Sequence, residues 1–194
     1  MPKDFRYPDK PTSSTLDFIS GLKSNYLAQA KINEWRILMF FENKKPPEIF
    51  TRHATTLKKA LKQELDKEIL DTLKEFNPTE LTIIDGGYIG RRGKHKPSIV
   101  LFDIMKKDSK WVTHWQYEKR DTEIKHIFKQ YFEKSPCIFL PEESRIDFGA
   151  FYEKQKTNPK DGLVEGIVVK ELSSTLIGGR KESVDNPCWF KAKW

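Results

Sequence analysis

The apolar residues of the chain follow two spacings, and together these predict a mixture of strands and helices. Continuous or alternating apolar runs bounded by turn-forming residues are typical of strands. Eight runs have this character, and we expect a strand in each: YLAQAKI (26–32), WRILMFF (35–41), EIFTR (48–52), LTIIDGGYIG (81–90), SIVLFDIM (98–105), PCIFLP (136–141), GLVEGIVVKEL (162–172) and PCWFKAKW (187–194).

Apolar residues spaced three or four apart predict helices in other segments of the chain. The longest helix is expected from about residue 55 to 76, and further helices are expected over 16–22, 121–133 and 147–156. Residues 1–14 contain three prolines and are expected to form an extended arm. This arm would lead to a helix that is capped at Ser14 or Thr15.

The predicted strands and helices do not alternate regularly, which favours an α+β fold with largely antiparallel sheets. A chain of 194 residues is long enough for a substantial core, and we expect a single domain over 1–194. The runs 81–90 and 98–105 are expected to pair as a hairpin through the basic turn RRGKHKP (91–97).

The charge and cysteine content narrow the range of partners and locations. A net charge of +7 favours a polyanionic partner, nucleic acid first. Cys137 and Cys188 have neither the spacing of a zinc site nor that of a disulfide framework, so reduced thiols are expected. The N-terminus lacks the apolar run of a signal peptide, and no stretch is long enough to span a bilayer. We therefore expect a cytoplasmic protein without a membrane partner.

Charged residues interrupt four of the apolar runs, in AKINEWR, TIIDGGYIG, VEGIVVK and WFKAKW. Strict alternation places Lys191 and Lys193 on one face of their strand, and Glu165 on the same face as Ile167 and Val169. Lysines neutralise phosphate, a carboxylate can hold Mg²⁺, and a desolvated lysine near other cations can act as a nucleophile. Any one segment alone would more often be an edge lysine or a turn.

As an ordered set, the segments resemble the motifs of the nucleotidyltransferase superfamily of ATP-dependent DNA and RNA ligases and mRNA capping enzymes. KINEWR (31–36) resembles the first motif, K-x-(D/N)-G-x-R, except at Glu34. IIDGGYIG and LFDIM resemble the D-G-E and F-D-(I/V/L) motifs. EGIVVK and WFKAKW match the E-G-(I/V)-V-x-K and K-x-K motifs, and TRHATTL and EKRDTEI resemble two arginine-bearing segments of the family.

The resemblance implies an ATP-grasp-like nucleotidyltransferase domain in which two antiparallel sheets, flanked by helices, enclose an ATP cleft. It also implies that the amine of Lys31 attacks the α-phosphate of ATP to give a lysyl-AMP intermediate. AMP would then pass to the 5′-phosphate end of a nicked duplex, and a 3′-hydroxyl would seal the strand. The expected cofactor is Mg²⁺ or Mn²⁺, and the expected activity is that of a polynucleotide ligase, with DNA slightly favoured.

The matching positions supply the candidate site residues, whose roles are those that the resemblance implies. The catalytic candidates are Lys31, Lys191 and Lys193. The nucleotide-binding candidates are Gln29, Lys31, Arg36, Arg52, Phe102, Glu165, Lys191 and Lys193, and the metal-binding candidates are Glu165 and Asp85.

The chain departs from the family pattern at two positions. Glu34 stands where the family has glycine, and Gly87 stands where the family has a glutamate that helps to hold ribose or metal. We hypothesise that Asp85 or Glu34 compensates for the missing glutamate; alternatively, Glu34 points outward and has no role.

The sequence printed ends one residue after KAK, whereas ligases and capping enzymes continue into an OB-fold domain. A minimal enzyme, a second chain that supplies the OB-fold function, and a truncated product are all compatible with this. Two other functions also stay open: an RNA ligase or capping-type guanylyltransferase, and a degenerate module that binds nucleotide or nucleic acid without turnover.

Overall fold

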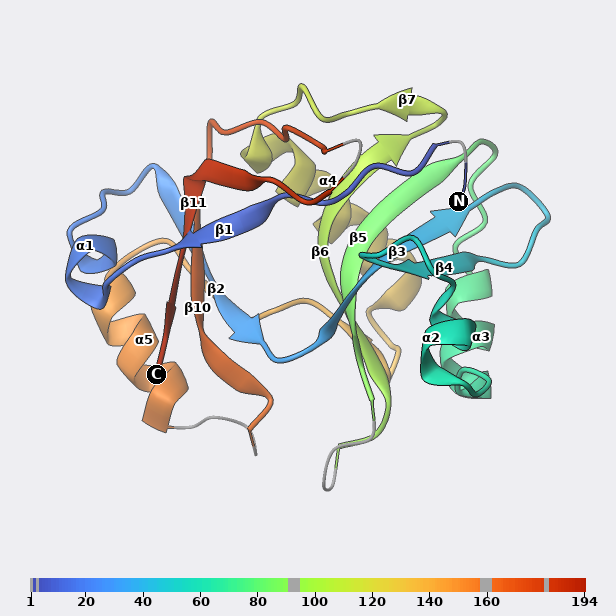
Figure 1. The fold of residues 1–194 in the computed structure, drawn as a ribbon, viewed down its shortest axis with the longest axis horizontal. Coiled ribbons are helices and arrows are strands. Elements are labelled where there is room, and N and C mark those ends of the chain that lie inside the picture. Colours follow the sequence, from blue (N-terminus) through green and yellow to red (C-terminus); the bar gives the residue numbers. More distant parts are fainter. Residues whose placement is uncertain (1, 3, 91–94, 158–161, 180–181) are drawn as a thin grey trace.

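The protein contains two β-sheets that lie side by side and are joined where β2 runs into β3 (Figure 1). The computed structural model describes residues 2, 4–90, 95–157, 162–179 and 182–194. The strands are β1 (Lys10–Ser13), β2 (Tyr26–Ile32), β3 (Trp35–Phe41), β4 (Glu48–Thr51), β5 (Thr82–Ile89), β6 (Ser98–Lys107), β7 (Lys110–Trp111), β8 (Ile138–Phe139), β9 (Glu143–Ser144), β10 (Val164–Glu171) and β11 (Asp185–Lys193). The helices are α1 (Leu16–Ser20), α2 (Leu57–Leu61), α3 (Lys67–Lys74), α4 (Tyr117–Ile127) and α5 (Phe148–Thr157).

The sheets are mainly antiparallel, as the sequence predicts. The first has the order β1-β11-β10-β2-β9, and the second has the order β4-β3-β5-β6-β7 with β8 paired to β6. Parallel pairing occurs between β1 and β11 and between β6 and β8. β5 and β6 form the expected antiparallel pair, but residues 91–94 of the turn predicted between them lie outside the described residues.

The continuous apolar run of β3 is explained by burial on both faces. Ile37, Met39 and Phe41 belong to a core cluster that includes apolar residues of α3 and α4. Leu38 and Phe40 face the other way and pack with residues of the first sheet, such as Leu27 and Trp189. A strand that is covered on both sides needs apolar residues at every position, which is why alternation is absent here.

β2 has one apolar face and one face that is partly polar. Ala28, Ala30 and Ile32 pack in a cluster with residues of α1 and α5. The intervening positions, which include Gln29 and Lys31, therefore face the second sheet. The alternation in YLAQAKI thus directs two polar side chains into the space between the sheets.

A bulge in β10 corrects the predicted orientation of Glu165. The register between β10 and β2 shifts between Val164 and Ile167, and Gly166 within the shift has a φ of 153°. A Cβ at Gly166 would lie 2.0 Å from the carbonyl oxygen of Ala192, so only glycine fits there. Because the bulge inserts a residue, Glu165 does not share the face of Ile167, contrary to strict alternation.

The predicted helix from 55 to 76 is wrong in its continuity, because the chain forms two helices there. Lys62 follows α2 with a left-handed φ of 55°, which ends the helix. Asp66 then caps α3 by accepting a hydrogen bond of 2.9 Å from the backbone N–H of Glu68. The helix predicted over 121–133 begins earlier, at Tyr117, and continues after α4 as a π-helical segment, Phe128–Phe132.

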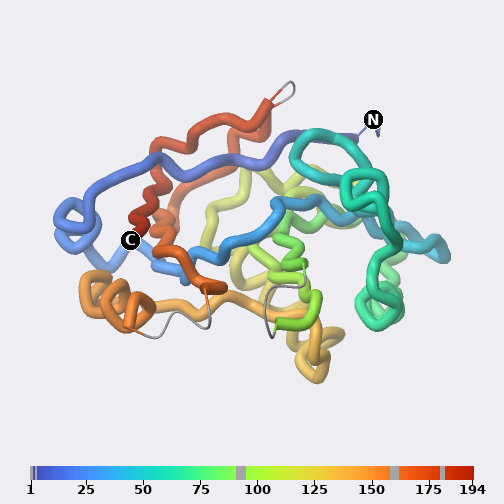
Figure 2. Tube along the Cα trace, turned by 60° about the horizontal axis from the view of Figure 1, so that its bottom comes forward, coloured from blue at the N-terminus to red at the C-terminus, as the bar shows by residue number. Residues whose placement is uncertain are grey.

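The N-terminal arm is part of the first sheet rather than a free extension. Its residues Lys10–Ser13 form β1 and run parallel to β11, so the arm and the C-terminal strand lie side by side (Figure 2). Thr15 caps α1, as expected, through a hydrogen bond of 3.2 Å from the N–H of Phe18. Both cysteines are free thiols, as predicted. None of the helices in the described part of the chain is long and apolar enough to cross a membrane.

Candidate nucleotide-binding site

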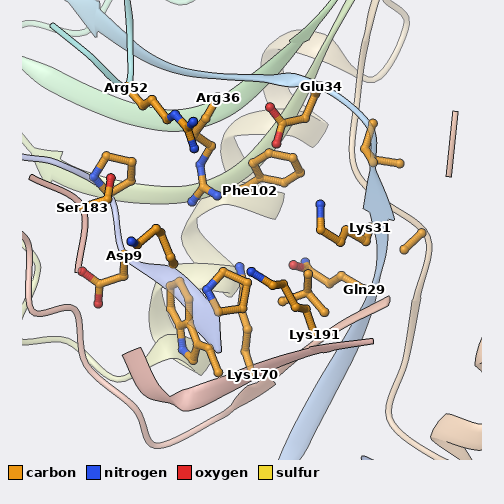
Figure 3. Close-up of a pocket in the computed structure, with 17 residues that line it drawn as sticks. Asp9, Gln29, Lys31, Glu34, Arg36, Arg52, Phe102, Lys170, Ser183 and Lys191 are labelled. Atoms are coloured by element: carbon orange, nitrogen blue, oxygen red, sulfur yellow. The ribbon is translucent and has the colours of Figure 1, made fainter. Parts of the chain in front are cut away.

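A cleft between the two sheets brings together most of the candidate site residues. Figure 3 shows Gln29, Lys31 and Lys191 on one side of the cleft, opposite Arg36 and Phe102. These side chains come from β2, β11, β3 and β6, and Arg52 adds a further cation just after β4. The segments lie far apart in the sequence, and the meeting of the two sheets collects them at one place.

Lys31 lies at the centre of a small network of charges. Its amine donates a hydrogen bond to the carboxylate of Glu165. The same carboxylate forms an ion pair with Lys193, with 2.9 Å between Nζ and Oε1. Burial raises the pKa of Glu165, but the hydrogen bonds from the two lysines outweigh this and leave the pKa below its ordinary value. Burial and the charges of Lys31 and Lys193 lower the pKa of Lys191. Two of the predicted cations, Lys31 and Lys193, therefore share one carboxylate, and the charge of Lys191 interacts with both of them.

Arg36 is held in place by Asp85 on the neighbouring strand. The guanidinium donates hydrogen bonds to both carboxylate oxygens, in the bidentate arrangement that fixes an arginine most firmly. Burial opposes the charge of Arg36, but the pairing with Asp85 outweighs it and raises the pKa of the guanidinium. The guanidinium also lies 5.1 Å from the ring centre of Phe102. Asp85 does not itself line the cleft, so its role here is to position Arg36.

Lys170 lies at the bottom of the cleft and was not among the predicted site residues. Its amine is 4.5 Å from the ring centre of Tyr117 and 4.7 Å from that of Trp189, and the residue is 4% exposed. Burial lowers the pKa of Lys170 to about 8, although Asp103 opposes the shift. The signal was present in the sequence, because Lys170 is the last residue of EGIVVK.

The arm supplies a wall of the cleft, which no sequence pattern indicated. Asp9 and Lys10 both line it. Asp9 is fully buried and accepts hydrogen bonds of 2.9, 2.9 and 2.8 Å from the N–H groups of Ile177 and Gly178 and from the side chain of Asn186. These hydrogen bonds attach the arm to β11 and to the loop between β10 and β11.

Arg120, the arginine of EKRDTEI, does not line the cleft. It is fully buried and pairs with Asp103 of β6 through hydrogen bonds of 2.9 and 3.2 Å. Asp103 directly follows Phe102, so this ion pair supports the strand that carries the aromatic ring.

A second recess adjoins the cleft and shares Lys31, Glu34, Arg36 and Arg52 with it. Trp35 borders this recess with its side chain 46% exposed. Exposed aromatic rings and cations together suit the stacked bases and phosphates of a nucleic acid end. One exposed aromatic ring therefore lies next to cations that line both recesses.

The described residues contain no group of three His, Cys, Asp or Glu side chains that could hold a metal ion by themselves. A single carboxylate is nevertheless compatible with Mg²⁺, which keeps several waters and binds substrate phosphates. Glu165, beside Lys31, is the residue that fits this requirement. Asp85 does not fit it, because both of its oxygens are taken by Arg36.

The chain has, throughout its length, the fold of the adenylyltransferase domain of ATP-dependent DNA ligases. Among solved structures, the chain is similar to the ligase domain of M. tuberculosis LigD with a TM-score of 0.71 and 16% identity. It is also similar to a mycobacterial DNA ligase D complexed with ATP and MES, with a TM-score of 0.73 and 15% identity.

Both of these matches cover 100% of this chain, which spans 61% and 62% of the two solved chains. A third similar structure is the ligase-adenylate of the Chlorella virus DNA ligase, with a TM-score of 0.62 and 13% identity over 97% of this chain and 67% of that one. No protein-family model and no curated protein sequence matches the chain. The likeness confirms the predicted α+β nucleotidyltransferase fold.

Proposed function

We propose that the chain is an ATP-dependent nucleotidyltransferase of the polynucleotide ligase type, with DNA slightly favoured over RNA as the substrate. The observation that supports this best is the position of Lys31. Its amine borders the cleft between the sheets, with Lys191 beside it and Phe102 opposite. A nucleotide whose base stacks on Phe102 would present its phosphates to these cations.

The proposed reaction starts with covalent catalysis by Lys31. The deprotonated amine attacks the α-phosphorus of ATP, a P–N bond forms, and the P–O bond to pyrophosphate breaks. Pyrophosphate leaves with the electron pair of that bond, and the proton of the amine is released to solvent. Lys191 and Lys193 stabilise the negative charge that develops on the α-phosphate, because they lie beside the attacking group.

The other predicted residues position the substrate. Gln29 faces the cleft and can both donate to and accept from a base edge. Arg36 and Arg52 contact phosphate and ribose from the opposite side. Glu165 would hold Mg²⁺, which supplies additional positive charge to the phosphates when it is bound. In the later steps AMP passes to a 5′-phosphate, and the 3′-hydroxyl on the other side of the nick attacks that phosphate, displaces AMP and seals the strand.

The first test is covalent labelling with nucleotide radiolabelled at the α-phosphate. Wild-type protein incubated with ATP and Mg²⁺ should retain label under denaturing conditions, and acid should release it because a phosphoramidate is acid-labile. Lys31→Ala should retain none, whereas Lys67→Ala, which changes an exposed lysine of α3, should label as the wild type does. Labelling with GTP in place of ATP would indicate the capping-type reaction, and label on Lys31→Ala would contradict the role of Lys31.

The second candidate is a module that binds a nucleotide or nucleic acid end without turnover. The departures at Glu34 and Gly87 favour it, because they alter the site next to Lys31. This function predicts that the wild type binds ATP but is never labelled. If label is found, nicked duplexes with a 5′-phosphate in DNA or in RNA then distinguish the two ligase activities by the product that is sealed.

A further inference from the structure

The side chain of Glu34 occupies the space that a side chain at position 87 would need. Position 87 lies on β5 directly opposite Arg36 on β3, and Glu34 precedes β3 by one residue. A Cβ added to Gly87 would lie 2.5 Å from the Cγ of Glu34 and 2.9 Å from its Cβ. Glu34 has no positive φ, so its backbone does not require glycine. The two departures from the family pattern are therefore in direct contact, and the glutamate at position 34 fits because position 87 has no side chain.

The carboxylate of Glu34 has an oxygen that lacks a partner. Its Oε2 atom is the one buried side-chain oxygen or nitrogen without a hydrogen bond across the described ranges 2, 4–90, 95–157, 162–179 and 182–194. The other carboxylates around the cleft are engaged: Asp9 with backbone N–H groups, Asp85 with Arg36, and Glu165 with two lysines. A buried oxygen left without a donor is destabilising, which indicates that a ligand supplies the donor.

The surroundings favour a hydroxyl group as that donor. Arg36 and Lys31 are the cations that act most strongly on Glu34, and they would repel a divalent metal ion. Burial outweighs the effect of these two cations and raises the pKa of Glu34 to about 7. Neither cation therefore compensates for the burial of the Glu34 carboxylate. In Figure 3 its oxygens lie next to the ring of Phe102, and the Lys31 side chain reaches into the cleft from the opposite side. In a nucleotide, the ribose joins the base to the α-phosphate.

We propose that Glu34 accepts a hydrogen bond from a ribose hydroxyl of the bound nucleotide, and that Gly87 is required because it leaves room for the Glu34 side chain. This inference rests on the proposed function, since a base on Phe102 and an α-phosphate at Lys31 place the sugar beside Glu34. It assigns to Glu34 the selection of ribonucleotides over deoxyribonucleotides, and it explains both departures by one arrangement.

The test is the dissociation constant of ATP, 2′-deoxyATP and 3′-deoxyATP, measured by calorimetry on Lys31→Ala protein so that no covalent step interferes. With Glu34 intact, ATP should bind at least about tenfold more tightly than one of the two deoxynucleotides, as expected for a hydrogen bond to a charged group. Adding Glu34→Ala should remove this preference, and adding Glu34→Gln should reduce it. Adding Glu64→Gln, which changes an exposed glutamate, should leave it intact.

Two outcomes overturn the inference in distinguishable ways. If ATP binds with Glu34 intact but the preference for ribose is absent, or persists after Glu34→Ala, Glu34 does not contact the sugar and the proposed function stands. If none of the three nucleotides binds to Lys31→Ala or to the wild type, both the inference and the proposed function fail.

A second measurement tests the pairing of positions 34 and 87 through thermal stability alone. Gly87→Ala should lower Tm, by about 5 °C, because its methyl group meets the Glu34 side chain. In the Glu34→Gly background the same change should lower Tm much less. Gly86→Ala is the control, because its Cβ would meet the carbonyl oxygen of Val100 at 2.5 Å in either background. Equal losses for Gly87→Ala in both backgrounds would contradict the pairing.

Discussion

Removing the guanidinium of Arg120 should destabilise the protein strongly, because it leaves a charge buried without its partner. Arg120 and Asp103 are both fully buried, and two hydrogen bonds of 2.9 and 3.2 Å join them. Arg120 also donates to the carbonyl oxygens of Trp115 and Ser174, so its loss frees four acceptor atoms in three residues, which lie in β6, in the loop before α4 and in the loop after β10. Breaking a buried ion pair from one side typically costs about 3–5 kcal/mol.

We expect Arg120→Met to lie near the lower end of that range, about 3 kcal/mol, because Lys170 is a second cation that acts on Asp103. For a domain of this size this corresponds to a fall in Tm of roughly 6–12 °C.

The assay is urea unfolding followed by tryptophan fluorescence at pH 8, with Asp103→Leu and the Arg120→Met/Asp103→Leu double variant alongside. The double variant should recover much of the loss, because it leaves no unpaired charge. A loss below about 1 kcal/mol for Arg120→Met at pH 8, or a double variant that is simply the sum of the two single ones, would refute this account of the pair.

Three further expectations follow from the same structure. Because the folded-state pKa of Lys170 is lowered to about 8, the wild type should gain stability relative to Lys170→Met as the pH rises from about 8 to 10, measured by unfolding across that range; an unchanged difference would contradict the burial of the charge. Asp9→Ala should release the arm and weaken ATP binding, which hydrogen exchange of residues 4–13 and calorimetry would detect; full protection in the variant would argue against the anchor. Lys62→Gly should raise stability by about 0.5–1 kcal/mol in thermal unfolding because φ is 55° there, whereas a loss would indicate that the Lys62 side chain stabilises the break.

Much of the site was predictable because strand alternation has a period of two. Leu27, Gln29 and Lys31 share one face of β2, and Lys191 and Lys193 share one face of β11, as the printed sequence indicates. Of these residues, Gln29, Lys31 and Lys191 line the same cleft once the two strands lie in one sheet, whereas Lys193 does not line it and pairs with Glu165. Alternation alone does not identify the fold. The adenylyltransferase fold was predicted from the resemblance of the charged segments to ligase motifs.

Other features could not be predicted, because they depend on interruptions of regular geometry. The bulge at Gly166 separates Glu165 from the face of Ile167, and it brings Gly166 into close contact with the backbone of Ala192 on the paired strand β11. The break at Lys62 is a single left-handed residue within a periodic apolar pattern that predicts one continuous helix. Neither event leaves a trace in the spacing of apolar residues.

The sequence by itself determined the α+β fold, the faces of the regular strands and the identity of the charged residues, since these follow from local periodicity and residue type. Only the tertiary structure decided which charges are free and which are already paired. Asp85 proved to be occupied by Arg36, Lys170 and the arm proved to belong to the cleft, and Glu34 proved to lie over Gly87 with an unpartnered oxygen. The reason is that pairing depends on distances between segments that meet only when the two sheets come together.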